Sequence, residues 1–182
     1  MAAEPRIPPL PENQWDDVLK AVAATTGPLH VFTTLGRHPE LFAAWIGLGS
    51  QLLMKGTLGD RVRELAILRT AHHRSCGYEW THHHRLGLAA GLTETEIAAL
   101  RQDRDAHPWD AGDRAVLRAA DELHATGTLG DAAWADLAGR FDERELIELV
   151  MLIGHYHMLA FALNALRVQP EEPDRPEEGG SR

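Results

Sequence analysis

The sequence predicts an all-α protein, and three observations support that prediction. Apolar residues recur at three- and four-residue spacing through most of the chain, as Trp15, Val18, Leu19 and Val22 do near its start. This repeat is typical of an α-helix that buries one face. No segment shows the alternation of apolar and polar residues that a half-buried β-strand shows. Glycine or proline separates the periodic segments from one another.

The expected helices follow one another along the chain. They lie around Trp15–Val22 and at residues 39–54, 60–74, 76–90, 93–100, 113–126, 131–140 and 142–167. Gly27 and Pro28 end the first helix, whereas Pro39 can open the second because proline fits a first helical turn. Residues 102–112 contain Pro108 and Gly112 and are expected to form a connecting loop.

Polar side chains at several helix starts are expected to act as N-caps. Such side chains accept hydrogen bonds from backbone N–H groups that lack a partner within the helix. The candidates are Asp60, Ser75, Asp131 and Asp142. Thr93, followed three residues later by Glu96, has the pattern of a capping box.

The chain length of 182 residues predicts one domain with a substantial core. Residues 1–11 contain four prolines and are expected to form an extended arm. Residues 12–168 are expected to form the helical domain. Residues 169–182 are acidic and rich in proline, with no apolar side chains to bury, and are expected to be disordered.

Composition excludes several classes of function. The net charge is −9, from 18 basic and 27 acidic residues, so no nucleic-acid partner is expected. The single cysteine, Cys76, excludes an intramolecular disulfide and fits a reducing compartment. We find neither an apolar run of about 20 residues nor a signal-peptide core, so no membrane partner and a cytoplasmic location are expected.

One short segment brings together three side chains that suit proton transfer. Cys76, Glu79 and His83 fall within roughly 60° of one another on a helix. Glu79 and His83 are one turn apart, so the carboxylate is expected to pair with the imidazole and raise its basicity. A helix start at Cys76 would lower the pKa of the thiol, an effect that Glu79 opposes. The alternative is a buried small thiol beside a surface Glu–His pair.

Residues 60–100 carry the pattern D-R-x-R-E-L-x-I-L-R, then C-x-Y-E-W-x-x-H, then G-L-T-x-x-E-I. This pattern resembles the carboxymuconolactone decarboxylase family, which includes the AhpD-type alkylhydroperoxidases. Residues 114–168, with A-A-D-E-L-H and G-H-Y-H-M-L-A, are also similar to members of that superfamily. The resemblance covers most of the chain outside its two tails and implies an AhpD-like multi-helix fold.

The resemblance implies roles for particular residues. In the peroxidase branch two cysteines, a histidine and an upstream glutamate work together; Cys76, His83 and Glu64 match the first cysteine, the histidine and the glutamate. Glu79 stands where the second cysteine would be, so a dithiol cycle is excluded. We therefore expect cofactor-independent acid–base catalysis by His83 and Glu79, supported by Glu64. The decarboxylase branch implies a small carboxylated lactone or a related enolisable acid as substrate.

Two alternatives remain open at this point. One is a thiol-dependent peroxidase that uses Cys76 alone and needs an external thiol to complete its cycle. The other is a non-catalytic oligomeric binding protein. Tyr156 is expected to contact substrate, and Trp80 is either a second contact or a packing anchor. Arg69 and Arg74 offer guanidinium groups that suit a carboxylate, although surface ion pairs are their default role.

The many histidines suggest a metal site, but their spacing does not support one. His72, His73 and His82–His84 are close in sequence, yet consecutive helical positions point about 100° apart and cannot share one ion. His155 or His157 would have to complete a site with Glu79 and His83. No metal is therefore expected.

Two further expectations concern organisation. The apolar helix from Leu146 to Val168 and the habit of the family predict a homo-oligomer, a trimer or a hexamer. Asp60–Leu65 and Asp142–Leu146 both open long helices that lead to histidines, which suggests a pseudo-repeat of a helical unit.

Overall fold

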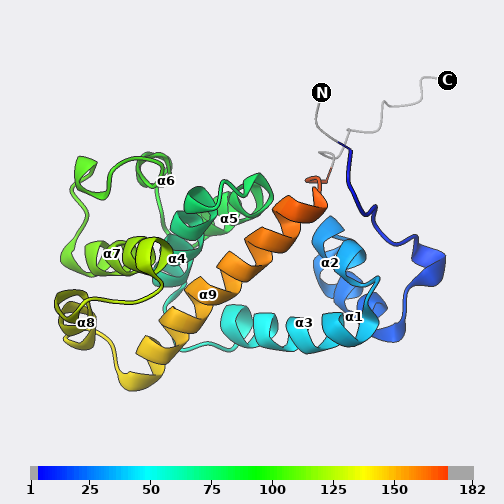
Figure 1. The fold of residues 1–182 in the computed structure, drawn as a ribbon, viewed down its shortest axis with the longest axis horizontal. Helices are drawn as coiled ribbons and strands as arrows, with labels where there is room; N and C mark the ends of the chain where they lie inside the picture. The colour runs from blue at the N-terminus through cyan, green and yellow to red at the C-terminus, as the bar shows by residue number, and fades with distance from the viewer. Residues whose placement is uncertain (1–3, 172–182) are drawn as a thin grey trace. The chain divides into compact units, whose positions relative to one another are not determined.

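A computed structural model of the protein describes residues 4–171 and shows an all-α fold, as predicted (Figure 1). Residues 4–171 contain no β-strand. The α-helices are α1 (Asp17–Thr26), α2 (His30–Leu35), α3 (Pro39–Met54), α4 (Asp60–His73), α5 (Gly77–Ala89), α6 (Glu94–Ala99), α7 (Ala111–Thr126), α8 (Asp131–Ala138) and α9 (Glu143–Leu166). Two 3₁₀ turns, η1 (Glu12–Gln14) and η2 (Arg104–Ala106), complete the order.

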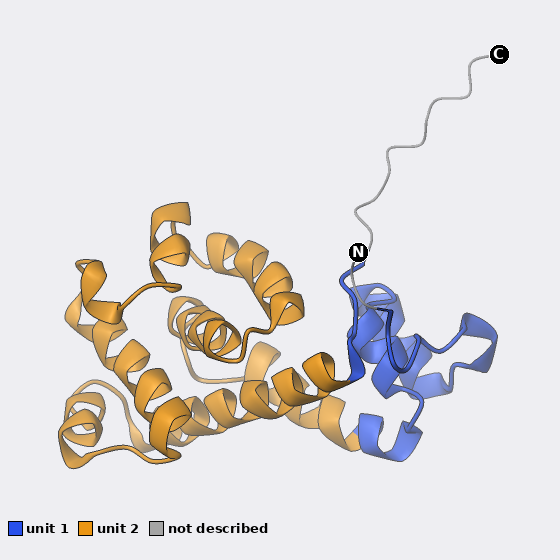
Figure 2. Ribbon diagram, turned by 45° about the horizontal axis from the view of Figure 1, so that its top comes forward, with its two compact units in different colours: residues 1–43, 166–182 blue, residues 44–165 orange. Residues whose placement is uncertain are grey.

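The chain divides into two compact units (Figure 2). In the first, the segment before α1 has no regular structure apart from η1, and Leu10 N donates to Thr33 O of α2. His30 N donates to Glu171 Oε1 at 2.6 Å, so residues 169–171 contact the start of α2. The rest of the expected disordered tail, 172–182, lies outside the described residues, as do residues 1–3 of the expected arm.

The second unit, residues 44–165, is built around α4. Every residue of α4 from Glu64 to Ala71 is buried, so this stretch is enclosed on all sides, and the helix packs against α5 and α7. Gly87 of α5 permits close packing, because an added Cβ would lie only 3.1 Å from Leu68 Cδ1 and from Leu92 Cδ1. This unit holds every site residue that the sequence predicts.

Helix α9 is the long apolar helix that the sequence predicts near its end. Residues such as Leu149, Leu152 and Leu163 are buried along one side. By length and composition alone α9 could cross a membrane. The expectation that no segment is apolar enough to span a membrane is therefore wrong for this helix. A core helix passes the same test, and 44% of its most apolar 18-residue window is buried.

Some helix ends match the predicted caps and others do not. The capping box of Thr93 and Glu96 is present at α6, and Asp142 Oδ1 accepts hydrogen bonds from two backbone N–H groups of α9, as predicted. The prediction that Asp60 and Asp131 are N-caps is wrong. Glycines occupy those positions, and each aspartate lies in the first turn, where its charge still favours the helix dipole.

Candidate active site

A tight turn between α4 and α5 places the only cysteine. Ser75 has a positive φ of 49°, and Cys76 N then donates to Ala71 O at 2.9 Å, which ends α4. Cys76 rather than Ser75 is the N-cap residue of α5. The thiol is therefore buried at the start of α5, with the backbone N–H groups of Tyr78 and Glu79 directed toward it.

The strongest polar contact of the site joins α4 to α5. His83 Nδ1 lies 2.7 Å from Glu64 Oε2, and both side chains are buried. A carboxylate in this position accepts Nδ1–H, which leaves Nε2 as the basic nitrogen of a neutral ring. Arg63 Nε lies 3.3 Å from the other oxygen of Glu64. The partner of His83 is thus Glu64, and the expected pairing with Glu79 along α5 is wrong.

Glu79 is a buried acid without a hydrogen-bond partner. Its residue is only 2% exposed, and neither carboxyl oxygen forms a hydrogen bond within the described residues. Burial penalises the charged form and raises the pKa of Glu79 to about 8, which the neighbouring Cys76 thiol opposes only weakly. Glu79 therefore carries a proton at neutral pH and is placed to act as an acid.

The thiol of Cys76 is protonated at neutral pH for the same physical reason. Burial, followed by the charge of Glu79, raises its pKa to about 12. The backbone N–H groups of Tyr78 and Glu79 act in the opposite direction but are outweighed. The predicted lowering of the thiol pKa by the helix start is therefore wrong, because burial dominates.

Tyr156 of α9 closes the group of candidate residues. Its ring centroid lies 5.0 Å from that of His83, with the two planes perpendicular. Burial, then the charges of Glu64 and Glu79, keep the pKa of Tyr156 well above its usual range. Tyr156 therefore lies near His83, Glu64 and Glu79. This position suits the substrate contact that is expected for Tyr156 from the sequence.

Trp80 has a different environment from the other predicted residues. The guanidinium of Arg101 lies 4.0 Å from the centroid of its ring. This is a cation–π interaction, and the backbone N–H of Trp80 donates to Cys76 O within the first turn of α5. This favours the packing role over the substrate contact.

His155 is a residue whose importance the sequence did not reveal. It is buried, its Nδ1 has no hydrogen-bond partner within residues 4–171, and burial lowers its pKa. Its ring stacks on Trp45 at a centroid distance of 5.8 Å and contacts Tyr156 edge-on at 5.5 Å. From the sequence, His155 was considered only as a possible metal ligand, and its position next to Tyr156 on an apolar helix was the other indication.

Two other histidines near the site have partners of their own. His84 contacts the exposed Glu94, and His157 contacts His124 rather than His83. In the described part of the chain, no three His, Cys, Asp or Glu side chains are arranged to hold a metal ion.

Part of the chain matches a known protein family. Residues 39–122 match the model of the carboxymuconolactone decarboxylase family. The predicted resemblance is confirmed. The family segment contains Glu64, Cys76, Glu79 and His83, whereas Tyr156 lies beyond it.

Solved structures share the fold. A peroxidase-related protein with an AhpD core from Ralstonia eutropha JMP134 has a TM-score of 0.80 at 20% identity, over 93% of this chain and 95% of that one. A putative antioxidant defence protein AhpD from Agrobacterium tumefaciens gives 0.70 at 21%, over 76% and 96%. The debrominase Bmp8, a cysteine-to-alanine variant with 2,3,4-tribromopyrrole, gives 0.76 at 18%, over 94% of each chain. No match to the sequence was found among curated proteins.

Proposed function

We propose that this protein is a cofactor-independent acid–base enzyme that decarboxylates a small carboxylated lactone or a related enolisable acid. The supporting observation is the buried Glu79 carboxyl group, protonated at neutral pH, in the same site as His83 held by Glu64. An enzyme that uses one group as an acid and another as a base needs two titratable groups in different environments, as Glu79 and His83 are. The family match at residues 39–122 supports the reaction class.

The proposed reaction needs a carbonyl group and a proton donor. The bond between the carboxylate carbon and its neighbour breaks, CO₂ leaves, and the electron pair passes into a conjugated carbonyl as an enolate. Glu79 then gives its proton to the substrate carbon. His83, with Nε2 as the basic nitrogen, returns a proton from solvent to Glu79 through water. The net reaction consumes one proton and releases one CO₂.

An assay that incubates the protein with carboxymuconolactone and measures the CO₂ released tests this proposal. We expect His83→Ala and Glu79→Gln each to lower kcat by about a hundredfold or more, the usual contribution of a general acid or base. His84→Ala is the matched control, because His84 lies on the same helix and pairs with exposed Glu94. Near-normal turnover in both site variants, with folding verified by circular dichroism, would refute the proposal.

A second candidate is a thiol-dependent peroxidase. It is favoured by the position of Cys76 at the start of α5, where two backbone N–H groups face its sulfur. The peroxidase-related protein and the debrominase with which it shares its fold also make thiol chemistry worth testing. Cys76 Sγ would take the terminal oxygen of a hydroperoxide and release an alcohol. Two external thiols would then reduce the sulfenic acid, releasing water and a disulfide.

Cys76→Ser separates the two candidates. A peroxidase loses hydroperoxide consumption in the presence of dithiothreitol, whereas a decarboxylase retains most of its CO₂ release, because Cys76 transfers no proton in that mechanism. Unchanged peroxide consumption in Cys76→Ser would remove the peroxidase candidate. Release of bromide from 2,3,4-tribromopyrrole with the same thiol provides a further assay of thiol chemistry.

A further inference from the structure

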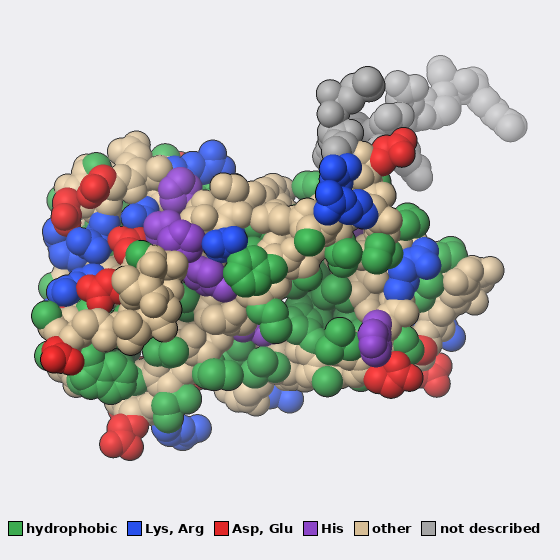
Figure 3. All heavy atoms as spheres, viewed as in Figure 1, with side chains coloured by type: hydrophobic (Ala, Val, Ile, Leu, Met, Phe, Trp, Pro, Cys, Tyr) green, Lys and Arg blue, Asp and Glu red, His purple; other side chains and the backbone are tan. Residues whose placement is uncertain are grey.

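Three imidazoles meet where α4, α7 and α9 pack together. The rings of His73 and His124 stack with centroids 4.4 Å apart and planes nearly parallel, and His124 Nδ1 lies 3.3 Å from His157 Nε2. Histidine side chains gather on one face in Figure 3, next to a basic side chain. No contact among the described residues joins these three histidines to Glu64, Glu79 or His83.

Hydrogen bonds fix which ring nitrogens carry protons. His157 Nδ1 lies 2.9 Å from Ile153 O, and a carbonyl only accepts, so Nδ1 carries the proton and Nε2 is the acceptor. His124 therefore donates Nδ1–H to His157 and, when neutral, has a lone pair on Nε2. His73 Nε2 donates to Asp121 Oδ1 at 2.7 Å. Protonation of the cluster would thus create a new donor at His124 Nε2.

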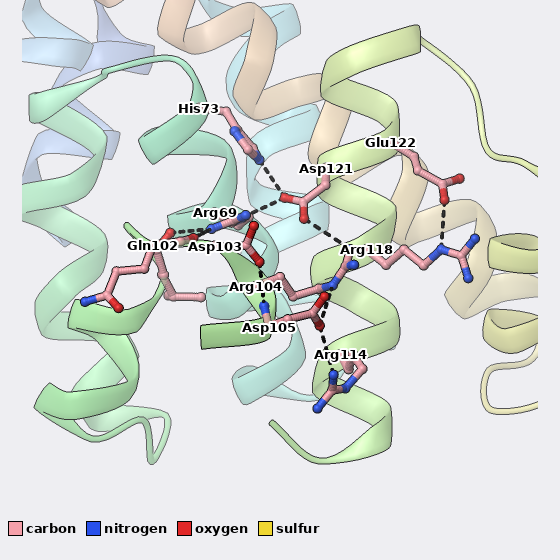
Figure 4. Close-up of polar contacts among 11 residues, drawn as sticks. Arg69, His73, Gln102, Asp103, Arg104, Asp105, Arg114, Arg118, Asp121 and Glu122 are labelled. Carbon is pink, nitrogen blue, oxygen red and sulfur yellow. Dashed lines mark hydrogen bonds and ion pairs between the residues drawn. The ribbon is translucent and has the colours of Figure 1, made fainter. Parts of the chain in front are cut away.

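Negative charge near the cluster is already neutralised. Asp121 Oδ1 accepts from Arg69 Nε at 2.6 Å as well as from His73, and Asp121 Oδ2 lies 3.3 Å from Arg104 (Figure 4). Although burial opposes it, these bonds lower the pKa of Asp121, which therefore stays ionised. One carboxylate is thus shared by two guanidinium groups and cannot also balance a protonated imidazole.

Arg74 adds a cation whose charge is not matched. Within residues 4–171 it makes no ion pair, and its buried Nε has no hydrogen-bond partner. Its guanidinium instead lies over the ring of Phe161, 4.5 Å from the centroid. Burial is the main cause of the lowered pKa of His124 and of His157. The charge of Arg74 also lowers the pKa of both rings. Arg74 follows His73 directly, and Phe161 lies one helical turn after His157 on α9, so the contact with Phe161 places the guanidinium beside the turn of α9 that carries His157.

We propose that Arg74 and the imidazole of His124 bind a small oxyanion, with His73 and His157 orienting the His124 ring. A guanidinium fork matches the oxygens of such an anion, and an imidazolium supplies a second charge-assisted donor. The anion would pair with the guanidinium of Arg74. It would also balance the positive charge of a protonated imidazole, which Asp121 cannot balance. This site is separate from the candidate active site and does not depend on the proposed function.

Binding is expected to be coupled to proton uptake. Besides the three histidines themselves, the charged groups that act on the imidazoles are Arg74 of α4 and Asp121 of α7; Arg69 and Arg104 bond to Asp121, and the ring of His72 contacts that of His73. Because burial, and after it the charges of His73, His157 and Arg74, lower the pKa of His124, its ring is mostly neutral at neutral pH in the free protein. An anion reverses part of that effect, so the complex holds one more proton and forms more tightly as pH falls.

Calorimetric titration with inorganic sulfate tests the proposal, because sulfate keeps its double charge over the relevant range. At constant ionic strength we expect saturable binding, roughly fivefold or more tighter at about pH 6.5 than at about pH 8.5. Arg74→Gln and His124→Gln should each weaken it about tenfold. Acetate, titrated in parallel, distinguishes a carboxylate ligand from a tetrahedral one by which anion binds more tightly.

Matched controls lie elsewhere on the same chain. Arg114→Gln and His84→Gln remove an arginine and a histidine that pair with exposed carboxylates, and sulfate binding should not change. In the unmodified protein, NMR titration of the ring protons of His124 should show a higher pKa with sulfate than without. Binding that is unaffected by Arg74→Gln and His124→Gln, or a His124 pKa that sulfate does not raise, would overturn the proposal.

Discussion

His83 Nδ1 and Glu64 Oε2 lie 2.7 Å apart although 19 residues separate them in the sequence. The contact joins the middle of α4 to the middle of α5, so neither helix can turn about its axis without breaking it. It also fixes the tautomer of His83 in the direction that exposes a basic Nε2. Glu64 is therefore a positioning residue.

Glu64→Gln is expected to lower kcat by about 10- to 100-fold with little change in KM. The amide retains the shape of the carboxylate but loses the negative charge that holds Nδ1–H of His83. Glu64→Asp should restore part of the rate, whereas an unchanged kcat in Glu64→Gln would show that the pair has no role in turnover.

Glu79 should make stability depend on pH. It titrates at about 8 in the folded protein against a usual value of 4.5, so the folded protein holds this proton more tightly than the unfolded chain. The stabilisation is complete below the usual value and is lost as pH rises through about 8. Relative to its effect near pH 4.5, Glu79→Gln should stabilise the protein at pH 8 by up to about 4 kcal/mol. Urea unfolding at the two pH values measures the difference; a pH-independent effect would contradict it.

Cys76 should react slowly with alkylating reagents. A thiol with a pKa of about 12 contains very little thiolate near neutral pH. We expect iodoacetamide to modify the native protein at least about a hundredfold more slowly than the unfolded chain. Mass spectrometry gives an unambiguous result because Cys76 is the only cysteine. Glu79→Gln should leave this rate nearly unchanged near neutral pH, because Glu79 is already uncharged there; equal rates in the native protein and the unfolded chain would contradict the raised pKa of the thiol.

Arg69 is a structural residue, in contrast to the substrate-binding role considered for it from the sequence. Besides Asp121, it donates to Leu100 O and Gln102 O, each at 2.7 Å, and ties α4 to the segment after α6 (Figure 4). Arg69→Met is expected to cost about 3–5 kcal/mol of unfolding free energy, because it leaves these groups unpaired. Arg114→Met, which removes an exposed pair with Asp105, should cost less than about 1 kcal/mol. Similar losses in the two variants would contradict this assignment.

Self-association remains a prediction, and α9 offers a surface for it. Ile147, Met151 and Met158 are exposed along one side of this helix. Glutamate at Met151 and Met158 should convert an oligomer to monomer without loss of helicity, because charge is costly in an apolar interface. Light scattering coupled to size-exclusion chromatography measures the mass. An unmodified protein that is already monomeric would disprove the predicted homo-oligomer.

Periodicity was sufficient to predict the helical class and most helices. The bounds of α3 agree with the prediction, and α9 differs by one residue at each end, because proline and an Asp–Glu capping pair mark their starts. Helix α2 was missed, since its six residues are too few to establish a period. Helix α7 begins two residues before the predicted start, because Gly112, which the sequence predicts to lie in a loop, is in its first turn.

The sequence indicated which residues belong to the candidate site, but it did not indicate which of them form hydrogen bonds with one another. Spacing along α5 could show that Glu79 and His83 share a face, but only the packing of α4 against α5 decides that His83 bonds to Glu64. The depth of burial of Cys76 is likewise a tertiary property, and it reversed the expected direction of the thiol pKa. His155 needed the fold, because its contact with Trp45 links residues that are far apart in sequence.

Tyr156 and His157 are neighbours on α9, yet one contacts His83 and the other contacts His124. Consecutive helical residues point about 100° apart, so a single helix serves two separate groups of side chains. Mutations that rotate α9 would disturb both groups at once. The candidate active site and the histidine cluster therefore share one mechanical support, even if their ligands have nothing in common.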